Sequence, residues 1–455
     1  MKILILGAGQ VGTSLAKFLS RDKANDLTIV DRDAEKLANL QRKLDIKTVI
    51  GNAAYPTVLE TADIQSMDMV IAVTQSDERN MLACQMAHTL YKVDKKIARI
   101  RTGEFLKNED LFAPYAIPID FVITPELIVT DYIKGIVEQP GAEHLFDFEN
   151  GLVQLVETKA YSGTPIVGHP IKDLHDHLPK TEVRILSLYR NGKAIPAYGE
   201  TIIHGQDHVY FATKKKDVPR VLKEFRRQDR PYKNIIIAGG GRIGLNLAAY
   251  LEKKHKVKII ERDKERALEI ADELYNTDVL QGNASDEELL LDENIENTDL
   301  FLALTDSDEI NVIVSILAKR LGAHKTVALV KRDVYEDLAE QSEDVDMVIS
   351  PDQITTSAIL KHIRSRGTME VHSLRHGTAE AIEIVARIKD GNNPVIGKQI
   401  SELSLPDGVI VGTVVRNDEV IMSSRELVIE ENDHVLLLLT DVSKIHEVEI
   451  LFSEE

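Results

Sequence analysis

The order of hydrophobic and polar positions predicts alternating strands and helices in the first 124 residues. Short apolar runs rich in Val and Ile are separated by longer segments with helical periodicity, such as residues 33–44 and 77–90. This alternation indicates a parallel sheet covered by helices on both faces and built from right-handed crossovers. The predicted strands are residues 3–6, 27–30, 48–50, 69–73, 97–100 and 121–123.

The same motifs recur in the same order about 230 residues later. The offset drifts by only a few residues, so the chain is an internal duplication. The matched segments are Gly7-Ala8-Gly9-Gln10-Val11-Gly12 with Gly239-Gly240-Gly241-Arg242-Ile243-Gly244, Gly51-Asn52-Ala53 with Gly282-Asn283-Ala284, and Thr74-Gln75-Ser76-Asp77 with Thr305-Asp306-Ser307-Asp308.

After each parallel unit the pattern changes to alternating strands with Gly, Asn and Pro turns, at residues 145–225 and 370–452. These parts match each other too, for example Asp207-His208 with Asp433-His434. The predicted fold class is α/β, with two Rossmann-like doubly wound parallel-sheet domains, each followed by a small β-rich α+β domain. The predicted bounds are 1–124 (N1), 144–228 (C1), 232–350 (N2) and 368–453 (C2).

Composition narrows the function classes. The 455 residues carry a formal net charge of -19, which argues against nucleic acid as a partner, because binding to phosphates rests on Lys and Arg. A strand beginning at residue 3 leaves no room for a signal sequence, and no apolar stretch approaches the ~20 residues that span a bilayer. We therefore expect a cytoplasmic chain that reaches a membrane only through a protein partner. The single cysteine, Cys84, lies in a helical pattern and is expected to be a buried structural thiol.

Each glycine loop is a Gly-x-Gly-x-x-Gly motif placed after a predicted strand and at the start of a helix. In the first copy Gly7 permits the tight turn, Gly9 lets a pyrophosphate approach the main chain, and Gly12 lets helix and strand pack closely. The free amides and the helix dipole then attract phosphate. This context predicts a dinucleotide site, with a turn that binds nothing as the alternative.

Polar residues at the ends of the following strands complete the predicted site. Asp31 is placed to accept the ribose hydroxyls and to repel a 2′-phosphate, which favours NAD over NADP, although Arg32 weakens that preference. Asn52 and Thr74 end the third and fourth strands, where contacts to adenine and ribose are one interpretation and a turn or a helix cap is the other. Arg99 lies in an apolar strand and needs an anion, for which a diphosphate is suited.

The second copy differs in charge from the first. Glu261 and Arg262 repeat the acidic and basic pair, and Asn283, Leu304 and Thr305 repeat the strand ends, but Leu329 replaces Arg99. Conversely, Arg242 replaces Gln10 and puts a cation at the helix start. Our hypothesis is that the second site tolerates more phosphate charge and binds ADP or ATP. Asp77 and Asp308 are expected to be caps or first-turn residues of their helices.

No catalytic constellation stands out. Hydride transfer needs an acid or base poised at the nicotinamide, and the fourteen histidines are scattered. His175, His177 and those between His372 and His376 lie beside predicted turns and are expected at the surface. We expect a protein that is not an enzyme, with an NAD-dependent oxidoreductase as the alternative.

The combination of motifs resembles the TrkA family, the regulatory subunits of Trk-type potassium uptake systems with two RCK (also called KTN) nucleotide domains, each followed by an RCK C-terminal domain. The resemblance covers essentially the whole chain. It rests on the glycine loops, the tandem order and the residues Asp31, Thr74, Asp77, Asn80, Arg99, Glu261 and Thr305.

The resemblance implies a function and a set of partners. It implies binding of NAD(H) and of ADP or ATP, a homotetramer whose eight nucleotide domains form a ring, and docking on a TrkH or TrkG type potassium channel subunit at the inner face of the plasma membrane. Nucleotide exchange would then shift the channel between closed and open states. Regulation of another ion carrier is the related alternative.

The resemblance also implies crossover helices and site residues. It implies that residues 126–138 and 352–364, each helical in pattern after a Pro, are crossover helices that pair neighbouring units. The candidate nucleotide-binding residues are Gly7, Ala8, Gly9, Gln10, Val11, Gly12, Asp31, Arg32, Asn52, Val73, Thr74 and Arg99 in the first copy, and Gly239, Gly240, Gly241, Arg242, Ile243, Gly244, Glu261, Arg262, Asn283, Leu304 and Thr305 in the second.

Overall fold

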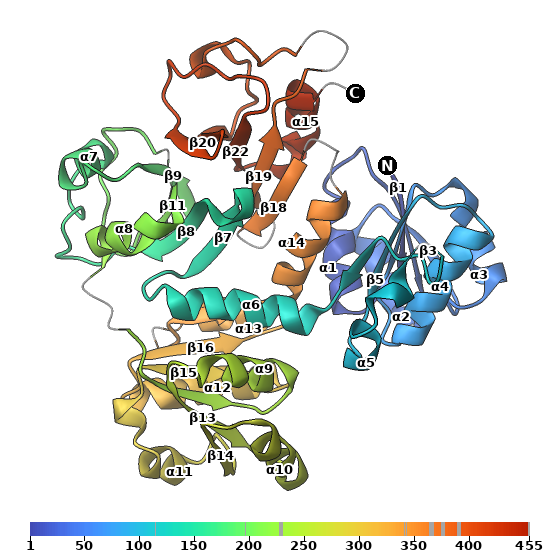
Figure 1. The fold of residues 1–455 in the computed structure, drawn as a ribbon, viewed down its shortest axis with the longest axis horizontal. Helices are drawn as coiled ribbons and strands as arrows, with labels where there is room; N and C mark the ends of the chain where they lie inside the picture. The colour runs from blue at the N-terminus through green and yellow to red at the C-terminus, as the bar shows by residue number, and fades with distance from the viewer. Residues whose placement is uncertain are drawn as a thin grey trace.

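A computed structural model describes residues 1–113, 115–195, 197–226, 231–340, 342, 344–363, 368–374, 378–388 and 393–453. It contains two six-stranded sheets and two five-stranded sheets (Figure 1). The predicted fold class is confirmed, because each parallel sheet is followed along the chain by an antiparallel one. Residues 227 and 228 at the predicted end of C1, and residue 364 at the predicted end of the second crossover helix, lie outside the described residues.

The N1 sheet is parallel, with the strand order β3-β2-β1-β4-β5-β6. The order reverses between β1 and β4, and ligands of open α/β sheets bind at the carboxyl ends of the strands beside such a reversal. Its strands are β1 (Lys2–Leu6), β2 (Asp26–Asp31), β3 (Lys47–Ile50), β4 (Met69–Ala72), β5 (Lys95–Arg99) and β6 (Phe121–Ile123). The connecting helices are α1 (Gln10–Leu19), α2 (Ala34–Lys43), α3 (Pro56–Thr61), α4 (Asp77–Thr89) and α5 (Gly103–Leu106), followed by α6 (Pro125–Glu138).

The N2 sheet repeats this topology, with the order β14-β13-β12-β15-β16-β17. Its strands are β12 (Asn234–Ala238), β13 (Lys256–Glu261), β14 (Thr277–Gln281), β15 (Leu300–Ala303), β16 (Lys325–Leu329) and β17 (Met347–Ile349). Its helices are α9 (Arg242–Leu251), α10 (Lys264–Glu273), α11 (Glu287–Asp292), α12 (Asp308–Arg320) and α13 (Asp333–Glu340), followed by α14 (Pro351–Ile363).

The C1 and C2 sheets are antiparallel and share one topology, β10-β9-β11-β8-β7 and its equivalent β21-β20-β22-β19-β18. C1 contains β7 (His144–Phe148), β8 (Val153–Lys159), β9 (Val183–Arg190), β10 (Lys193–Ile195), β11 (His208–Lys214), α7 (Leu174–His177) and α8 (Val218–Phe225). C2 contains β18 (Thr368–Leu374), β19 (Ala379–Val385), β20 (Val409–Arg416), β21 (Glu419–Met422), β22 (His434–Leu439) and α15 (Ile445–Ser453).

The two helices that follow the parallel sheets cross to the other half of the chain. Helix α6 follows the N1 sheet but packs against α9 of N2, and α14 follows the N2 sheet but packs against α1 of N1 (Figure 1). The two crossing helices also contact each other. Residues 126–138 and 352–363 are thus helical as expected, and within this chain they pair N1 with N2.

The sequence predicted a buried Cys84 and histidines at the surface, and the structure agrees in part. Cys84 is fully buried, and burial raises the pKa of its thiol to about 12. His372 is half-buried and not fully at the surface as expected, because its ring packs against Phe146 and Phe148 at centroid distances of 5.0 Å. Burial lowers the pKa of His372 to about 4. The sequence could not show this, because the covering aromatic residues belong to C1. His376 lies outside the described residues.

C1 and C2 pack sheet against sheet, and Gly412 lies close to Leu186 of the opposite sheet. The interface is apolar and includes Leu155 and Leu186 from C1 and Val415 and Leu436 from C2. A Cβ atom at Gly412 would lie 3.0 and 3.1 Å from the two terminal methyl carbons of Leu186.

We predict that Gly412→Leu will wedge the two sheets apart and cost about 1–3 kcal/mol, because overpacking forces side chains and strands to shift. Thermal unfolding will measure the loss, and small-angle X-ray scattering will show a larger radius of gyration. Gly103→Leu is the control, because no atom lies within 4 Å of a Cβ there. Equal effects of the two substitutions would show that the close approach at Gly412 has no such role.

Candidate nucleotide sites

The three glycines of the first loop differ in the steric reason for which a side chain is absent. Gly7 has a φ of +113°, in the left-handed region that favours glycine. A Cβ at Gly12 would lie 1.9 Å from the carbonyl oxygen of Gly7, so only glycine lets α1 start this close to β1. At Gly9 nothing lies within 4 Å, and the main chain there is open to an approaching group. In the second loop, Gly241 is open in the same way and a Cβ at Gly244 would lie 2.1 Å from the Gly239 oxygen.

The carboxylate of Asp31 holds the loop in place. Its Oδ2 accepts a hydrogen bond from the amide of Ala8 at 2.6 Å, and its Oδ1 accepts one from the amide of Asp33 at 2.9 Å. Glu261 makes the equivalent pair with the amides of Gly240 and Asp263, both at 2.8 Å. The acidic residue therefore orders the glycine loop, and any contact with a ribose would use its remaining lone pairs.

A buried asparagine connects the ends of β4 and β5. Asn80 Oδ1 accepts hydrogen bonds from the amide and hydroxyl of Thr74, and Asn80 Nδ2 donates to the carbonyl of Arg99 at 2.8 Å. Arg99 Nη2 donates to the carbonyl of Thr74 at 2.7 Å. Thr74 and Arg99 are thereby fixed beside each other at the carboxyl edge of the sheet. Asn311 repeats the network in N2 with Thr305 and Leu329.

Asp77 and Asp308 lie in the first turns of α4 and α12. Of the two expected roles, helix cap or first-turn residue, the second is confirmed. The caps themselves are Ser76 and Ser307, whose hydroxyls accept hydrogen bonds from amides of α4 and α12. The buried carboxylate of Asp77 accepts hydrogen bonds from the amides of Arg101 and Thr102, and so ties α4 to the segment after β5. Its pKa is lowered, because these hydrogen bonds outweigh the burial that opposes ionisation.

The two loops open onto one cavity of about 990 Å³ between N1 and N2. Its wall includes Gly9, Asp31 and Thr74 from N1 and Gly241, Arg242 and Thr305 from N2. Pro125 and Pro351, the first residues of the two crossing helices, also line it. The shared wall follows from the exchange of α6 and α14, which brings the two carboxyl edges face to face.

The cavity is rich in cations although the chain is acidic. Eight basic and four acidic residues line it: Arg32, Lys36, Arg79, Arg99, Arg101, Arg242, Arg266 and Lys331 against Asp31, Glu126, Asp306 and Asp352. A concave surface lined by excess cations concentrates anions. Burial and the neighbouring Arg101 lower the pKa of the Arg99 guanidinium, as expected for a cation with too little compensating charge.

Three buried polar atoms at this wall lack a hydrogen-bond partner among the described residues. They are the Nε atoms of Arg99 and Arg101 and the Oε2 atom of Glu126. Buried polar groups are normally paired, so unpaired guanidinium donors that line a cavity fit an anionic ligand. The open main chain at Gly9 fits a pyrophosphate in the same place.

The second loop is more enclosed than the first. A Cβ at Gly240 would lie 2.1 Å from the side chain of Ile270, and Arg266 Nε donates to the carbonyl of Gly240 at 3.0 Å. The carboxylate of Glu261 does not line the cavity, whereas that of Asp31 does. Arg266 instead adds a cation beside Arg242.

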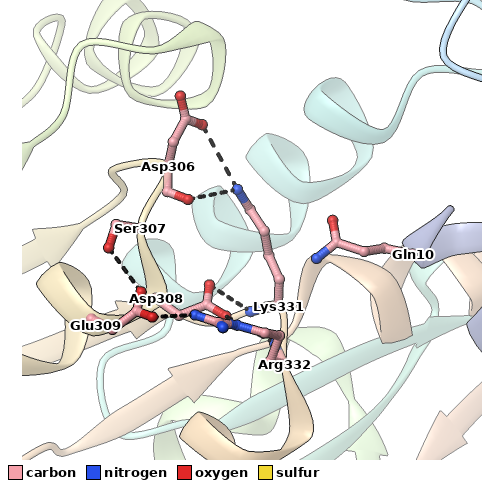
Figure 2. A pocket seen from close by; sticks show the side chains of 7 residues that line it. All are labelled: Gln10, Asp306, Ser307, Asp308, Glu309, Lys331 and Arg332. Carbon is pink, nitrogen blue, oxygen red and sulfur yellow. Dashed lines mark hydrogen bonds and ion pairs between the residues drawn. The ribbon is translucent and has the colours of Figure 1, made fainter.

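The residue after the second glycine of each loop faces the opposite unit. Arg242 Nη1 donates to the carbonyl of Arg101 at 3.1 Å. Gln10 lines a smaller pocket of about 300 Å³ with the strand-end residues of N2 (Figure 2). In that pocket Lys331 lies 3.7 Å from Asp306, and Arg332 pairs with Asp308 and Glu309. Cations of one unit are thus placed within reach of an anion bound in the other.

Of the residues expected at the sites, fourteen line the large cavity and nine do not. Asn52 and Asn283 are among the nine, and each accepts a hydrogen bond from the amide two residues on, as the turn alternative held. The lining residues are Gly7, Gly9, Gln10, Val11, Asp31, Arg32, Val73, Thr74, Arg99, Gly241, Arg242, Ile243, Leu304 and Thr305. The others are Ala8, Gly12, Asn52, Gly239, Gly240, Gly244, Glu261, Arg262 and Asn283.

The expected set lacked five basic residues of the cavity. Lys36, Arg79 and Arg101 belong to N1, and Arg266 and Lys331 belong to N2. Arg101 could have been found from its spacing, since it follows Arg99 by two residues beside the end of β5, and Lys331 follows Leu329 at the end of β16 in the same way. The other three lie on helices and carry no comparable signal.

Comparison with known families matches both halves of the chain. TrkA-N domain models match residues 3–125 and 235–351, and TrkA-C domain models match residues 155–226 and 385–449. The Trk system potassium uptake protein TrkA of Halomonas elongata is 45% identical over 452 residues, with 99% of this chain and 98% of that protein covered. The protein of the same name from Vibrio alginolyticus is 44% identical over 453 residues, with the same coverage.

Solved structures share the fold at low identity. The GsuK RCK domain superposes with a TM-score of 0.61 and 19% identity, covering 100% of this chain and 95% of that one. The GsuK channel bound to NAD gives a TM-score of 0.61 at 18% identity, covering 99% and 78%.

We predict that Gly12→Ala will destabilise N1 by about 1–3 kcal/mol or more, because its Cβ would overlap the Gly7 carbonyl. Gly9→Ala is the matched control and should stay within about 1 kcal/mol of wild type, since the site is open and its φ of -74° suits alanine. Thermal unfolding of both variants will test this. A stable Gly12→Ala protein would mean that the close start of α1 is not required.

Proposed function

The chain belongs to the TrkA family, and from this premise we propose that it is the nucleotide-sensing regulatory subunit of a Trk-type potassium uptake system. It would bind NAD(H) and adenine nucleotides and control a TrkH or TrkG type channel subunit as a homotetramer, at the inner face of the membrane. Relatives along the whole chain bear the name of Trk system potassium uptake proteins. Within the described ranges, each helix is too short or too polar to traverse a bilayer. The unit bounds 1–124, 144–228, 232–350 and 368–453 belong to this proposal.

The observation that carries the proposal is the cationic cavity shared by the two glycine loops. In N1, the amides after Gly9 and the guanidinium of Arg99 would hold the diphosphate of NAD(H). Asp31 and Thr74 would meet the ribose and the base at the strand ends. Similar solved channels are bound to NAD and to ADP, which supports these ligands as candidates here.

A nucleotide can change the channel only if it binds one arrangement of the units better than another. The cavity wall would provide this difference in affinity, because residues of both N1 and N2 line it and their separation depends on how the two units are arranged. Arg242 lies within hydrogen-bond distance of the N1 segment at Arg101, so a ligand in N1 meets charge from N2. Its phosphates would therefore set the separation of the two units. Movement of α6 and α14, which begin at this cavity, would carry the change to C1 and C2.

The two sites would prefer different nucleotides. N1 combines a half-buried carboxylate that lines the cavity, Asp31, with Arg99, which suits a dinucleotide with a ribose at the β2 end. N2 has Leu329 in place of Arg99 and collects Arg242, Arg266 and Lys331 near its loop. We propose that N2 binds the greater phosphate charge, as ADP or ATP.

We predict that Gly9→Asp and Arg99→Ala will each weaken NADH binding at least tenfold. The first puts a carboxylate where phosphate would lie, and the second removes a charge-assisted donor, worth about 1.5–3 kcal/mol. Calorimetric titration of the full chain with NADH, NAD, ADP and ATP will measure both. Arg220→Ala, an exposed change on α8, is the control and should bind as wild type.

Unchanged NADH binding in Gly9→Asp and Arg99→Ala, or none in wild type, would refute the first site. A substrate-dependent loss of NADH absorbance would favour the oxidoreductase alternative instead. A protein that binds nucleotides but changes the current of another carrier, and of no Trk channel, would favour the other regulatory alternative.

We further predict that the preferences separate when each loop is blocked alone. Gly9→Asp and Gly241→Asp are matched, because neither Cβ meets another atom within 4 Å. The Gly9→Asp protein should retain ATP or ADP binding and lose the dinucleotide. The Gly241→Asp protein should retain NADH. Identical nucleotide preferences in the two variants would refute the proposed difference between the sites.

A further inference from the structure

A second group of ionisable side chains lies in C1, away from the cavity. Glu143, Glu157 and His208 each place one ligand atom within 4.8 Å of the other two. His208 Nδ1 lies 3.0 Å from Glu143 Oε2 and 3.2 Å from Glu157 Oε1. Both carboxylates are buried, and the imidazole is about one third exposed, which leaves a path from solvent.

We propose that Glu143, Glu157 and His208 bind a divalent transition-metal ion such as Zn²⁺ or Mn²⁺. Imidazole with two carboxylates is a ligand set that suits these ions. Ligand atoms that each lie about 2.0–2.2 Å from one ion are roughly 2.8–3.6 Å apart, from octahedral to tetrahedral arrangement, and the two distances of 3.0 and 3.2 Å fall in this range.

A divalent ion would balance the charge of the two carboxylates better than a proton on His208 does. Two buried carboxylates with one imidazolium leave a net negative charge out of water, which is costly. A divalent ion with a neutral imidazole cancels the two carboxylates. The guanidinium of Arg226 donates to the Gly141 carbonyl and lies over the ring of Tyr161, and its positive charge offsets part of the negative charge at Glu143.

Neighbouring strands surround Glu157 with further groups that can ligate or orient. In the sheet register, Glu157 lies between His144 on β7 and Tyr210 on β11. The Tyr210 hydroxyl donates to Glu157 Oε2, and His144 Nε2 lies 4.0 Å from that atom. His144 is in turn hydrogen-bonded to Tyr132 of α6.

The internal duplication supplies a comparison within the same chain. In C2, His434 and Glu383 repeat the His208 and Glu157 pair, with Glu149 from C1 as the third member. There His434 Nδ1 lies only 2.6 Å from Glu383 and 2.5 Å from Glu149, which are distances of hydrogen-bonded ion pairs. The register positions of His144 and Tyr210 are held by Glu370 and Leu436.

The place of the site gives it a mechanical consequence. Glu143 follows the short segment 139–142 that joins α6 to β7, and its amide donates to the Glu157 carbonyl at 2.8 Å. An ion bound here would fix the start of C1 relative to the crossing helix.

The test is calorimetric titration of the chelator-treated full chain with ZnCl2 at pH 7.5. We expect one Zn²⁺ ion to bind per chain at this site. His208→Gln and Glu143→Gln should each weaken this event at least roughly tenfold.

His434→Gln is the matched control and should bind Zn²⁺ as wild type does. Glu143→Gln keeps the side-chain volume, so it decides the matter even if the histidine variant folds poorly, and circular dichroism will check both. Identical isotherms for wild type and Glu143→Gln would overturn the proposal, as would equal losses in the His208 and His434 variants. Mg²⁺ or Ca²⁺ binding as tight as that of Zn²⁺ would also overturn it, because these ions prefer oxygen ligands alone.

Discussion

The exchange of α6 and α14 between the two parallel units is the constraint on which the arrangement of the sites depends. Each helix carries an apolar face that its own sheet leaves uncovered. Val129, Ile133 and Ile136 of α6 are buried in the core that includes α9, and Ile359 and Leu360 of α14 are buried in the core that includes α1. At roughly 1.5–3 kcal/mol for each buried aliphatic side chain, this packing outweighs surface ion pairs of about 0–1 kcal/mol. The two carboxyl edges face each other as a result.

This geometry explains why an acidic chain can hold a cationic chamber. The glycine loops supply amides and helix dipoles, which attract anions whatever the net charge of the chain. The basic residues then come from both units and project into one enclosed space. Its low-dielectric walls strengthen their field, whereas the net charge of -19 is spread over an exposed surface and screened within about 10 Å by salt.

The sequence predicted the parts of this structure that local physics determines. Gly7 and Gly12 could be assigned because their roles are steric, and the strands could be placed because buried parallel strands are continuous apolar runs. For Asn52 the sequence left two interpretations, a turn or a ligand contact. The structure shows a turn residue that does not line the cavity. Arg266 could not be predicted, since its role arises from contact between segments far apart in the chain.

Comparison of the two copies distinguishes residues with a structural role from residues that line the cavity, which neither copy would allow on its own. The pairs Arg190–Asp207 and Arg416–Asp433 are bidentate in both halves, with a fully buried aspartate. Residues that occur in both copies and form hydrogen bonds only within their own unit have a structural role. Asn80 and Asn311 are a further example. Two pairs of positions that differ in charge, Arg99 against Leu329 and Gln10 against Arg242, lie on the cavity wall. Because the two loops share one chamber, charge bound at one loop would alter the electrostatic field at the other, and unequal loops would let two different anions influence each other's binding.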